Sequence, residues 1–126
     1  MGVGTLWYMR TILLVADTQS VTDRVHASLA GADATVVDHT DPKTAPQVAY
    51  DGGFDSVLVD MQVDAMGAMA VARAVRSAAG QHDPIPVTIL LDRESDAFLA
   101  GRSGAKNWVP KDYTSAELRE ALGVSR

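Results

Sequence analysis

The segment Ser56-Val57-Leu58-Val59-Asp60 constrains the fold of this chain more than any other. Its three consecutive aliphatic residues predict a short strand that is buried on both faces, and such strands usually lie inside a parallel sheet. Asp60 ends the run, so its carboxylate is expected at the carboxyl edge of the sheet, where open α/β folds bind ligands. The alternative for Asp60 is a solvated acid at a strand end. We favour the functional interpretation.

Further strands and helices alternate around this segment. Four more apolar runs predict strands at residues 11–15, 34–37, 87–91 and 105–109. Five helices are predicted. The first begins at Thr18 or Ser20, and the second begins at Thr40 or Asp41 with Pro42 in its first position. The third and fourth cover residues 66–79 and 97–102, and the fifth begins at Thr114. The last of these begins with a Thr114–Glu117 capping box.

Five strand–helix alternations predict a doubly wound α/β fold with a parallel sheet covered on both faces. Of the two common strand orders, the flavodoxin-like order 2-1-3-4-5 suits five strands. Pro110 has no amide hydrogen to donate to a sheet, which favours an edge position for the fifth strand. With 126 residues, we expect one domain over 11–126 after an N-terminal extension over 1–10.

Composition narrows the function classes. The chain has no cysteine, which excludes disulfides and thiolate metal sites. Its net charge of -5, without a cluster of lysine and arginine, argues against direct binding of nucleic acid or an anionic membrane. No apolar run approaches the roughly 20 residues of a membrane span, and the N-terminus does not match a signal peptide. We therefore expect a cytoplasmic location.

Three polar residues are predicted to meet at the carboxyl edge of the sheet: Asp17, Asp60 and Lys111. Neighbouring carboxylates attract a divalent cation with oxygen ligands, typically Mg²⁺. A lysine opposite them can neutralise a phosphoryl group, so the set suits phosphoryl transfer onto a carboxylate. Two alternatives stay open, in which Asp17 caps the first helix and Lys111 is an ordinary surface lysine.

These residues, over the stretch from Thr11 to Leu122, resemble a response-regulator receiver domain of bacterial two-component signalling. The resemblance implies that Asp60 is phosphorylated by a histidine kinase or a small phosphodonor, and that Lys111 contacts the phosphoryl group. It also implies Mg²⁺ held by Asp17, Asp60 and the backbone carbonyl of Gln62. The spacing of Gly104-Ala105, Trp108 and Lys111-Asp112-Tyr113 matches the family as well.

Four positions depart from the family pattern: Ala16 replaces a second acid, Leu91 a serine or threonine, Asp64 a loop proline, and Asp112 the proline that follows the lysine. With Ala16, Mg²⁺ affinity should fall. Leu91 has no hydroxyl to follow a phosphoryl group, so the family's relay to the aromatic at Trp108 is expected to be absent. Without a proline at 112, a cis peptide bond there would cost roughly 3 kcal/mol and is not expected. The pattern predicts an atypical receiver with an incomplete site.

The favoured function is a stand-alone atypical receiver that signals by protein contact, because no effector segment follows Arg126. The expected contact face comprises the segments 97–102, 105–109 and 114–122, with a homodimer as one outcome. Activity would be limited to self-catalysed phosphotransfer and dephosphorylation at Asp60. The alternative is a phosphorylation-independent pseudo-receiver that acts as a constitutive interaction module. A flavodoxin-type cofactor protein is disfavoured because the loop after the first strand lacks glycine.

Overall fold

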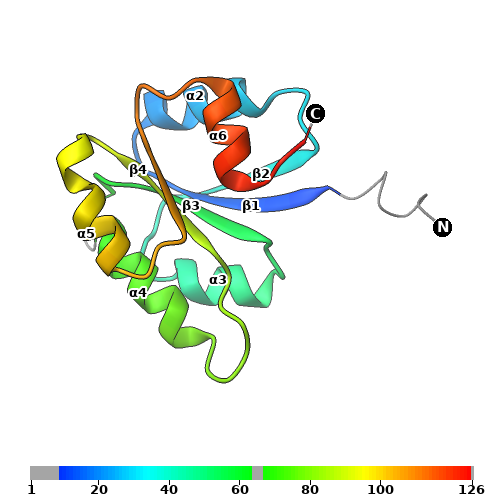
Figure 1. Ribbon diagram of the computed structural model, residues 1–126. Helices are drawn as coiled ribbons and strands as arrows, with labels where there is room; N and C mark the ends of the chain where they lie inside the picture. The colour runs from blue at the N-terminus through cyan, green and yellow to red at the C-terminus, as the bar shows by residue number, and fades with distance from the viewer. Residues whose placement is uncertain (1–8, 64–66, 126) are drawn as a thin grey trace.

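The computed structural model describes residues 9–63 and 67–125 as a parallel sheet between two layers of helices (Figure 1). The strands are β1 (Arg10–Val15), β2 (Ala34–His39), β3 (Ser56–Asp60), β4 (Val87–Leu91) and β5 (Asn107–Pro110). The helices are α2 (Gln19–Leu29), α3 (Ala45–Asp51), α4 (Ala68–Ala78), α5 (Ala97–Arg102) and α6 (Ser115–Leu122). A single 3₁₀ turn, η1 (Glu94–Asp96), precedes α5.

The strand order is β2-β1-β3-β4-β5, and every neighbouring pair is parallel. The predicted flavodoxin-like order 2-1-3-4-5 is therefore confirmed, with β5 at an edge. The central strand β3 pairs with β1 and β4, and Asp60 lies opposite Leu90. This register brings the carboxyl ends of β1, β3, β4 and β5 to one edge of the sheet.

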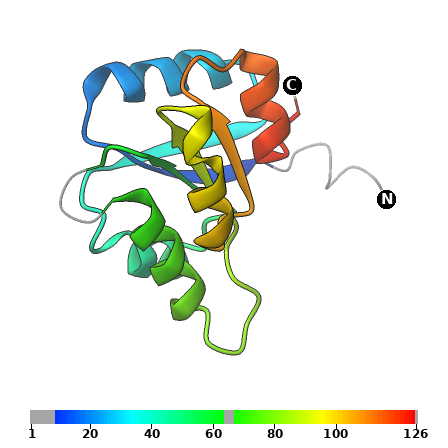
Figure 2. The same cartoon turned by 60° about the vertical axis from the view of Figure 1, so that its left-hand side comes forward.

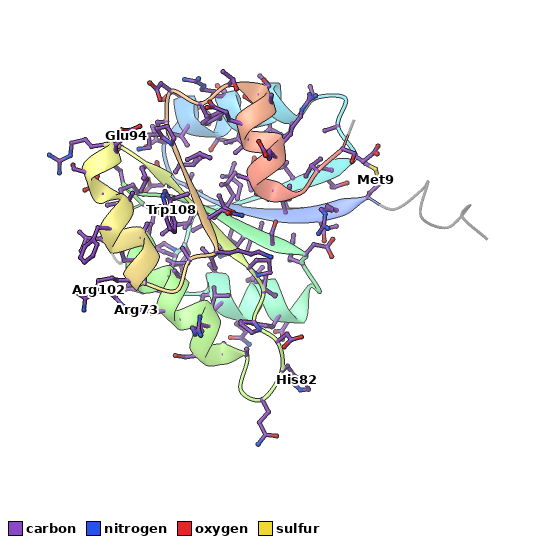
Figure 3. All side chains as sticks on the ribbon, viewed as in Figure 1. Met9, Arg73, His82, Glu94, Arg102 and Trp108 are labelled. Atoms are coloured by element: carbon purple, nitrogen blue, oxygen red, sulfur yellow. The ribbon has the colours of Figure 1, made fainter. Side chains whose placement is uncertain are left out.

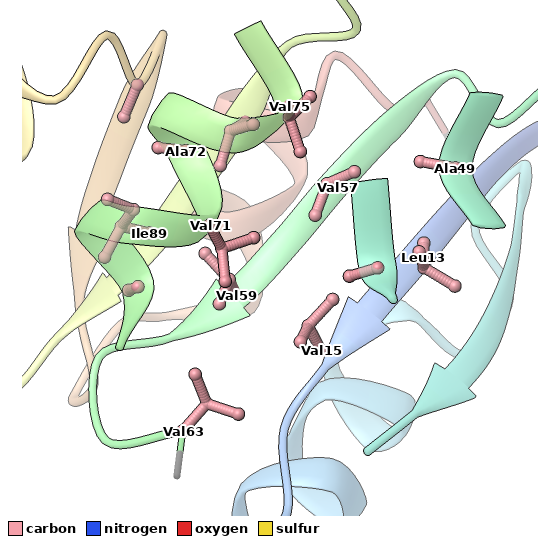
Figure 4. Packing of buried hydrophobic residues seen from close by; sticks show 14 of the residues in the cluster. Leu13, Val15, Ala49, Val57, Val59, Val63, Val71, Ala72, Val75 and Ile89 are labelled. Carbon is pink, nitrogen blue, oxygen red and sulfur yellow. The ribbon is translucent and has the colours of Figure 1, made fainter. Parts of the chain in front are cut away.

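Alternating side chains divide the core into two clusters, because successive strand residues point to opposite faces. On one face, α2 and α6 cover the cluster that contains Ile12, Leu14, Leu58 and Leu90. On the other face, α3, α4 and α5 cover a cluster whose strand residues include Leu13, Val15, Val57, Val59 and Ile89 (Figure 4). Val87 and Leu91 belong to the same cluster. Figure 2 brings α5 forward and shows it beside β5, at the edge of the sheet.

Several element boundaries differ from the predictions. β1 begins at Arg10, one residue before the predicted start, and residues 1–8 of the predicted extension lie outside the described residues. The predicted start of the third helix at Met66 also lies outside them, and α4 begins at Ala68. β5 starts at Asn107 rather than Ala105.

The prediction that Pro42 opens the second helix is wrong. Helix α3 begins at Ala45 with Thr44 as N-cap, and Pro46 occupies its first turn. The Asp41 carboxylate instead accepts a hydrogen bond from the backbone N–H of Lys43 at 2.9 Å. This side-chain hydrogen bond stabilises a turn at Asp41–Lys43 instead of a helix start. Aspartate side chains compete with helical hydrogen bonding for nearby backbone N–H groups.

The predicted capping box at the start of α6 is confirmed. The Glu117 N–H donates to Thr114 Oγ1 at 3.1 Å, and the Thr114 N–H donates to Glu117 Oε1 at 2.8 Å. The box fixes the start of α6 directly after the turn that follows β5. That turn carries Lys111, so its backbone is held from both sides.

None of the helices within residues 9–63 and 67–125 combines the length and the hydropathy that crossing a lipid bilayer requires.

Candidate functional site

Asp60 and Lys111 meet at the carboxyl edge of the sheet, as the sequence predicts. Asp60 ends β3 and is 0% exposed. The Nζ atom of Lys111, which follows β5, lies 2.6 Å from Asp60 Oδ1, and the lysine side chain is 27% exposed. The alternatives of a solvated Asp60 and an ordinary surface Lys111 are therefore wrong. A buried carboxylate needs a partner of opposite charge, and Lys111 supplies it.

The backbone around Lys111 explains how its side chain reaches Asp60. The Lys111 N–H donates to the Leu91 carbonyl at 2.9 Å, which extends the β4–β5 pairing past the end of β5. The Tyr113 N–H then donates to the Pro110 carbonyl at 3.1 Å and closes a tight turn. All peptide bonds within the described residues are trans, including the bond before Asp112, as the sequence predicts.

The two oxygens of the Asp60 carboxylate have different surroundings. Oδ1 accepts hydrogen bonds from Lys111 Nζ and, at 3.1 Å, from the backbone N–H of Gln62. Oδ2 is buried and has no hydrogen-bond partner among the described residues. Buried polar atoms normally have partners, so an unpartnered one calls for an explanation such as a bound ion or a catalytic role. Oδ2 is therefore the atom of this carboxylate with capacity for a ligand.

Asp92 is a site residue that the sequence reasoning missed. Its Oδ1 lies 2.5 Å from Lys111 Nζ, and its Oδ2 accepts a hydrogen bond from Gln62 Nε2. Asp92 directly follows Leu91 at the end of β4, and β4 lies between the strands that carry Asp60 and Lys111. The reasoning that grouped the other carboxylates at this edge applies equally to Asp92.

The shared ion pair shifts two pKa values. Partial burial alone would lower the pKa of Lys111, but hydrogen bonds to Asp60 and Asp92, together with their charges, raise it above 10.5. Partial burial alone would raise the pKa of Asp92. Hydrogen bonds from Lys111 and Gln62, with the positive charges of Lys111 and Arg93, lower the Asp92 pKa below 3.8.

These shifts predict how the Asp92–Lys111 pair contributes to stability at different pH. The contribution of Asp92 is complete above pH 3.8 and is lost as the pH falls through its lowered folded-state pKa. The contribution of Lys111 is complete below pH 10.5 and is lost as the pH rises through its raised folded-state pKa. Urea unfolding of the wild type and Asp92→Asn should therefore differ most between these limits. A difference that stays constant across the whole range would contradict the prediction.

The candidate magnesium ligands lie around the same edge. Asp17 follows β1 and is exposed, and because the N-cap of α2 is Thr18, the alternative that Asp17 caps this helix is wrong. Gln62 lies on the loop after β3, and Ala16 is buried. Within the described residues, no three His, Asp or Glu side chains form a metal cluster. The orphaned Asp60 Oδ2, the Asp17 carboxylate and the Gln62 carbonyl are nevertheless all oxygen donors, the ligand type that Mg²⁺ prefers.

Leu91 and Trp108, which stand at the two positions of the family's relay, have contrasting environments. Leu91 is 1% exposed and belongs to the core cluster under α4 and α5. Trp108 is 39% exposed and packs against α5, where a Cβ atom added to Gly101 would lie 3.3 Å from the indole ring (Figure 3). Leu91 is thus a buried packing residue, and the Trp108 side chain is partly packed against α5 and partly exposed to solvent. Asp64, the other departure near the site, lies outside the described residues.

Comparison with known sequences finds a relative among curated proteins. No family model matches the chain. The sensory transduction protein RegX3 of Mycobacterium tuberculosis is 30% identical over 112 residues, which cover 87% of this chain and 48% of RegX3. The chain thus spans about half the length of the curated relatives that it matches.

Comparison with solved structures finds proteins that share the fold described above. The receiver domain of the sensor histidine kinase PA1611 from Pseudomonas aeruginosa, which holds a magnesium ion in its active site cleft, matches with a TM-score of 0.75 and 20% identity over 91% of this chain and 98% of that chain. The receiver domain of Ssk1 from Saccharomyces cerevisiae, crystallised with the histidine phosphotransfer protein Ypd1, matches with a TM-score of 0.79 and 16% identity over 90% and 86%. These likenesses confirm the predicted fold class.

Proposed function

We propose that this chain, which is a response-regulator receiver domain in its fold and in its sequence similarity, accepts a phosphoryl group on Asp60 in two-component signalling. One observation carries the proposal. The buried carboxylate of Asp60 lies 2.6 Å from the Lys111 ammonium, and its second oxygen has no partner among the described residues. A nucleophilic carboxylate beside a fixed cation is the arrangement that phosphoryl transfer requires.

The transfer step needs only groups that the site and a phosphodonor supply. A carboxylate oxygen of Asp60 attacks the phosphorus, and a new O–P bond forms while the bond to the leaving group breaks. The leaving group, a histidine nitrogen of a kinase or the acetate of acetyl phosphate, departs with the electron pair. Lys111 balances the negative charge of the transferred group as a point charge. Mg²⁺ held by Asp17, Asp60 and the Gln62 carbonyl would add positive charge at the phosphoryl oxygens.

Partners and output follow from this role. The magnesium of PA1611 and the phosphotransfer partner of Ssk1 support a metal and a histidine phosphodonor for this chain as well. We assign output to the face of α5, β5 and α6, where Phe98 is 70% exposed beside the half-exposed Leu99 and Trp108. A second copy of the chain is one candidate for this face. Catalysis beyond self-phosphorylation and dephosphorylation is not proposed, and a cytoplasmic location stays a prediction.

Intact mass after incubation with acetyl phosphate and Mg²⁺ tests the phosphoacceptor directly. We expect the wild type to gain about 80 Da per phosphoryl group and Asp60→Asn to gain nothing. Asn keeps the size of the side chain but is a far weaker nucleophile. A gain of the same size in both proteins would place the acceptor elsewhere in the chain.

A phosphorylation-independent interaction module is the second candidate. Two observations favour it: Leu91 buries an aliphatic side chain where a relay hydroxyl would be needed, and Ala16 supplies no second carboxylate for Mg²⁺. If the folded wild type shows no mass gain and no Mg²⁺ binding, this second candidate replaces the first. A partner would then bind equally well with and without the phosphodonor.

A further inference from the structure

The carboxylate of Asp92 binds two residues that both contact the Asp60 acceptor. Its Oδ1 is 2.5 Å from Lys111 Nζ, and its Oδ2 accepts a hydrogen bond from Gln62 Nε2. The same Lys111 Nζ and the backbone N–H of Gln62 both contact Asp60 Oδ1, at 2.6 and 3.1 Å. Two bridges therefore connect Asp92 to the acceptor, one from the end of β5 and one from the loop after β3.

The two bridges lie against Asp60 Oδ1, and Asp60 is fully buried. Asp60 has no exposed surface, so the phosphorus of a donor cannot reach either oxygen in this conformation. Asp92 is 26% exposed at its side chain and thus lies on the solvent side of the Lys111 ammonium. Lys111 and Gln62 are thus held by Asp92 as well as by Asp60, so a phosphoryl group that takes over the Lys111 ammonium competes with the Asp92 carboxylate.

The charges of the adjoining cleft also oppose the approach of an anionic phosphodonor. A cleft of about 500 Å³ opens beside the pair, lined by Arg24, Asp92, Glu94, Pro110, Lys111 and Asp112. Its three carboxylates outnumber its two cations, so an anionic donor meets net repulsion there. Asp92 is the carboxylate that also takes up part of the positive charge of Lys111, which a phosphoryl group would need.

We propose that Asp92 is a positioning residue that fastens Lys111 and Gln62 over Asp60 in the unphosphorylated chain, and that a phosphoryl group on Asp60 displaces Asp92 from Lys111. The inference rests on the proposed function and adds a regulatory contact to the same site. Asp92 stands between the end of β4 and η1, which leads into α5 (Figure 3 shows Glu94 at the start of this segment). Its displacement gives the α5 face a route of response that requires no hydroxyl at position 91.

The initial rate of phosphoryl uptake from acetyl phosphate, followed by intact mass, tests the inference. We expect Asp92→Asn to gain mass about tenfold faster than the wild type, because the competing charge beside Lys111 is removed. Glu94→Gln is the matched control, since it removes the same charge from the same cleft without touching Lys111. Its rate should stay within about twofold of the wild type. Asp92→Ala, which also removes both hydrogen bonds, should behave like Asp92→Asn.

A second readout follows Lys111 without any phosphodonor. Acetic anhydride acylates free amines, and peptide mapping compares Lys111 with the exposed Lys106 in the same protein. We expect acylation of Lys111 relative to Lys106 to increase several-fold in Asp92→Asn and to stay unchanged in Glu94→Gln, because loss of Asp92 removes one of the two carboxylates that hold the Lys111 amine. An unchanged ratio would mean that Asp92 does not restrain Lys111 and would overturn the inference.

The outcomes separate the two proposals. Faster uptake and faster Lys111 acylation in Asp92→Asn support the inference. Equal or slower uptake in Asp92→Asn overturns the inference alone, since Asp60 would still be a phosphoacceptor. Absence of mass gain from every variant overturns the proposed function and, with it, the displacement of Asp92 by a phosphoryl group.

Discussion

Replacing Lys111 with methionine should lower the free energy of unfolding by about 3 kcal/mol, the lower end of the range for removing one member of a buried ion pair. Methionine keeps much of the length and apolar surface of the lysine stem but loses the charge. Asp60 is then left as a fully buried carboxylate without its cation, at a position with no exposed surface. Because Lys111 itself is 27% exposed, solvent offsets part of the loss.

Urea unfolding of four proteins checks this prediction. Lys106→Met is the matched control, because Lys106 is an exposed lysine just before β5, and its replacement should change stability by about 0.5 kcal/mol or less. The double variant Asp60→Asn/Lys111→Met removes both charges and should recover at least about 1 kcal/mol of the loss. If Lys111→Met and Lys106→Met cost the same, Asp60 does not depend on Lys111 for its burial.

The fold was predictable because the strands are marked by their own composition. Continuous aliphatic runs such as Val57–Val59 identify strands that helices cover on both faces, and the alternation of runs with helical segments leaves few topologies. The meeting of Asp60 and Lys111 followed from the same rule, since parallel strands bring their carboxyl ends to one edge. Here local pattern and global fold agree.

The sequence-based predictions failed where a side chain has several possible hydrogen-bond or ion-pair partners. Pro42 had a suitable position for a helix start, yet the Asp41 carboxylate takes the Lys43 N–H and holds a turn. Asp92 occupies the edge that the topology specifies, but its sharing of one ammonium with Asp60 depends on the conformations of three side chains. Sequence patterns indicate which residues come close to one another, but they do not specify which of the possible side-chain contacts form.

The site accordingly combines the buried Asp60 carboxylate with a core residue, Leu91, at the position where the family pattern has a serine or threonine. Leu91 ends β4 one residue before Asp92, and its side chain points into the cluster under α4 and α5. The end of β4 thus contributes packing through one residue and charge through the next. The two contributions can be separated by substitution.

Leu91→Ala should lower the free energy of unfolding by about 3 kcal/mol, because it deletes a fully packed side chain and leaves a cavity beneath α4 and α5. Leu99→Ala on α5 is the control, since Leu99 is half exposed and should cost about 0.5 kcal/mol or less. Chemical denaturation of both variants measures the difference. A loss at position 91 no larger than at position 99 would mean that the packing of Leu91 in the core does not stabilise the fold.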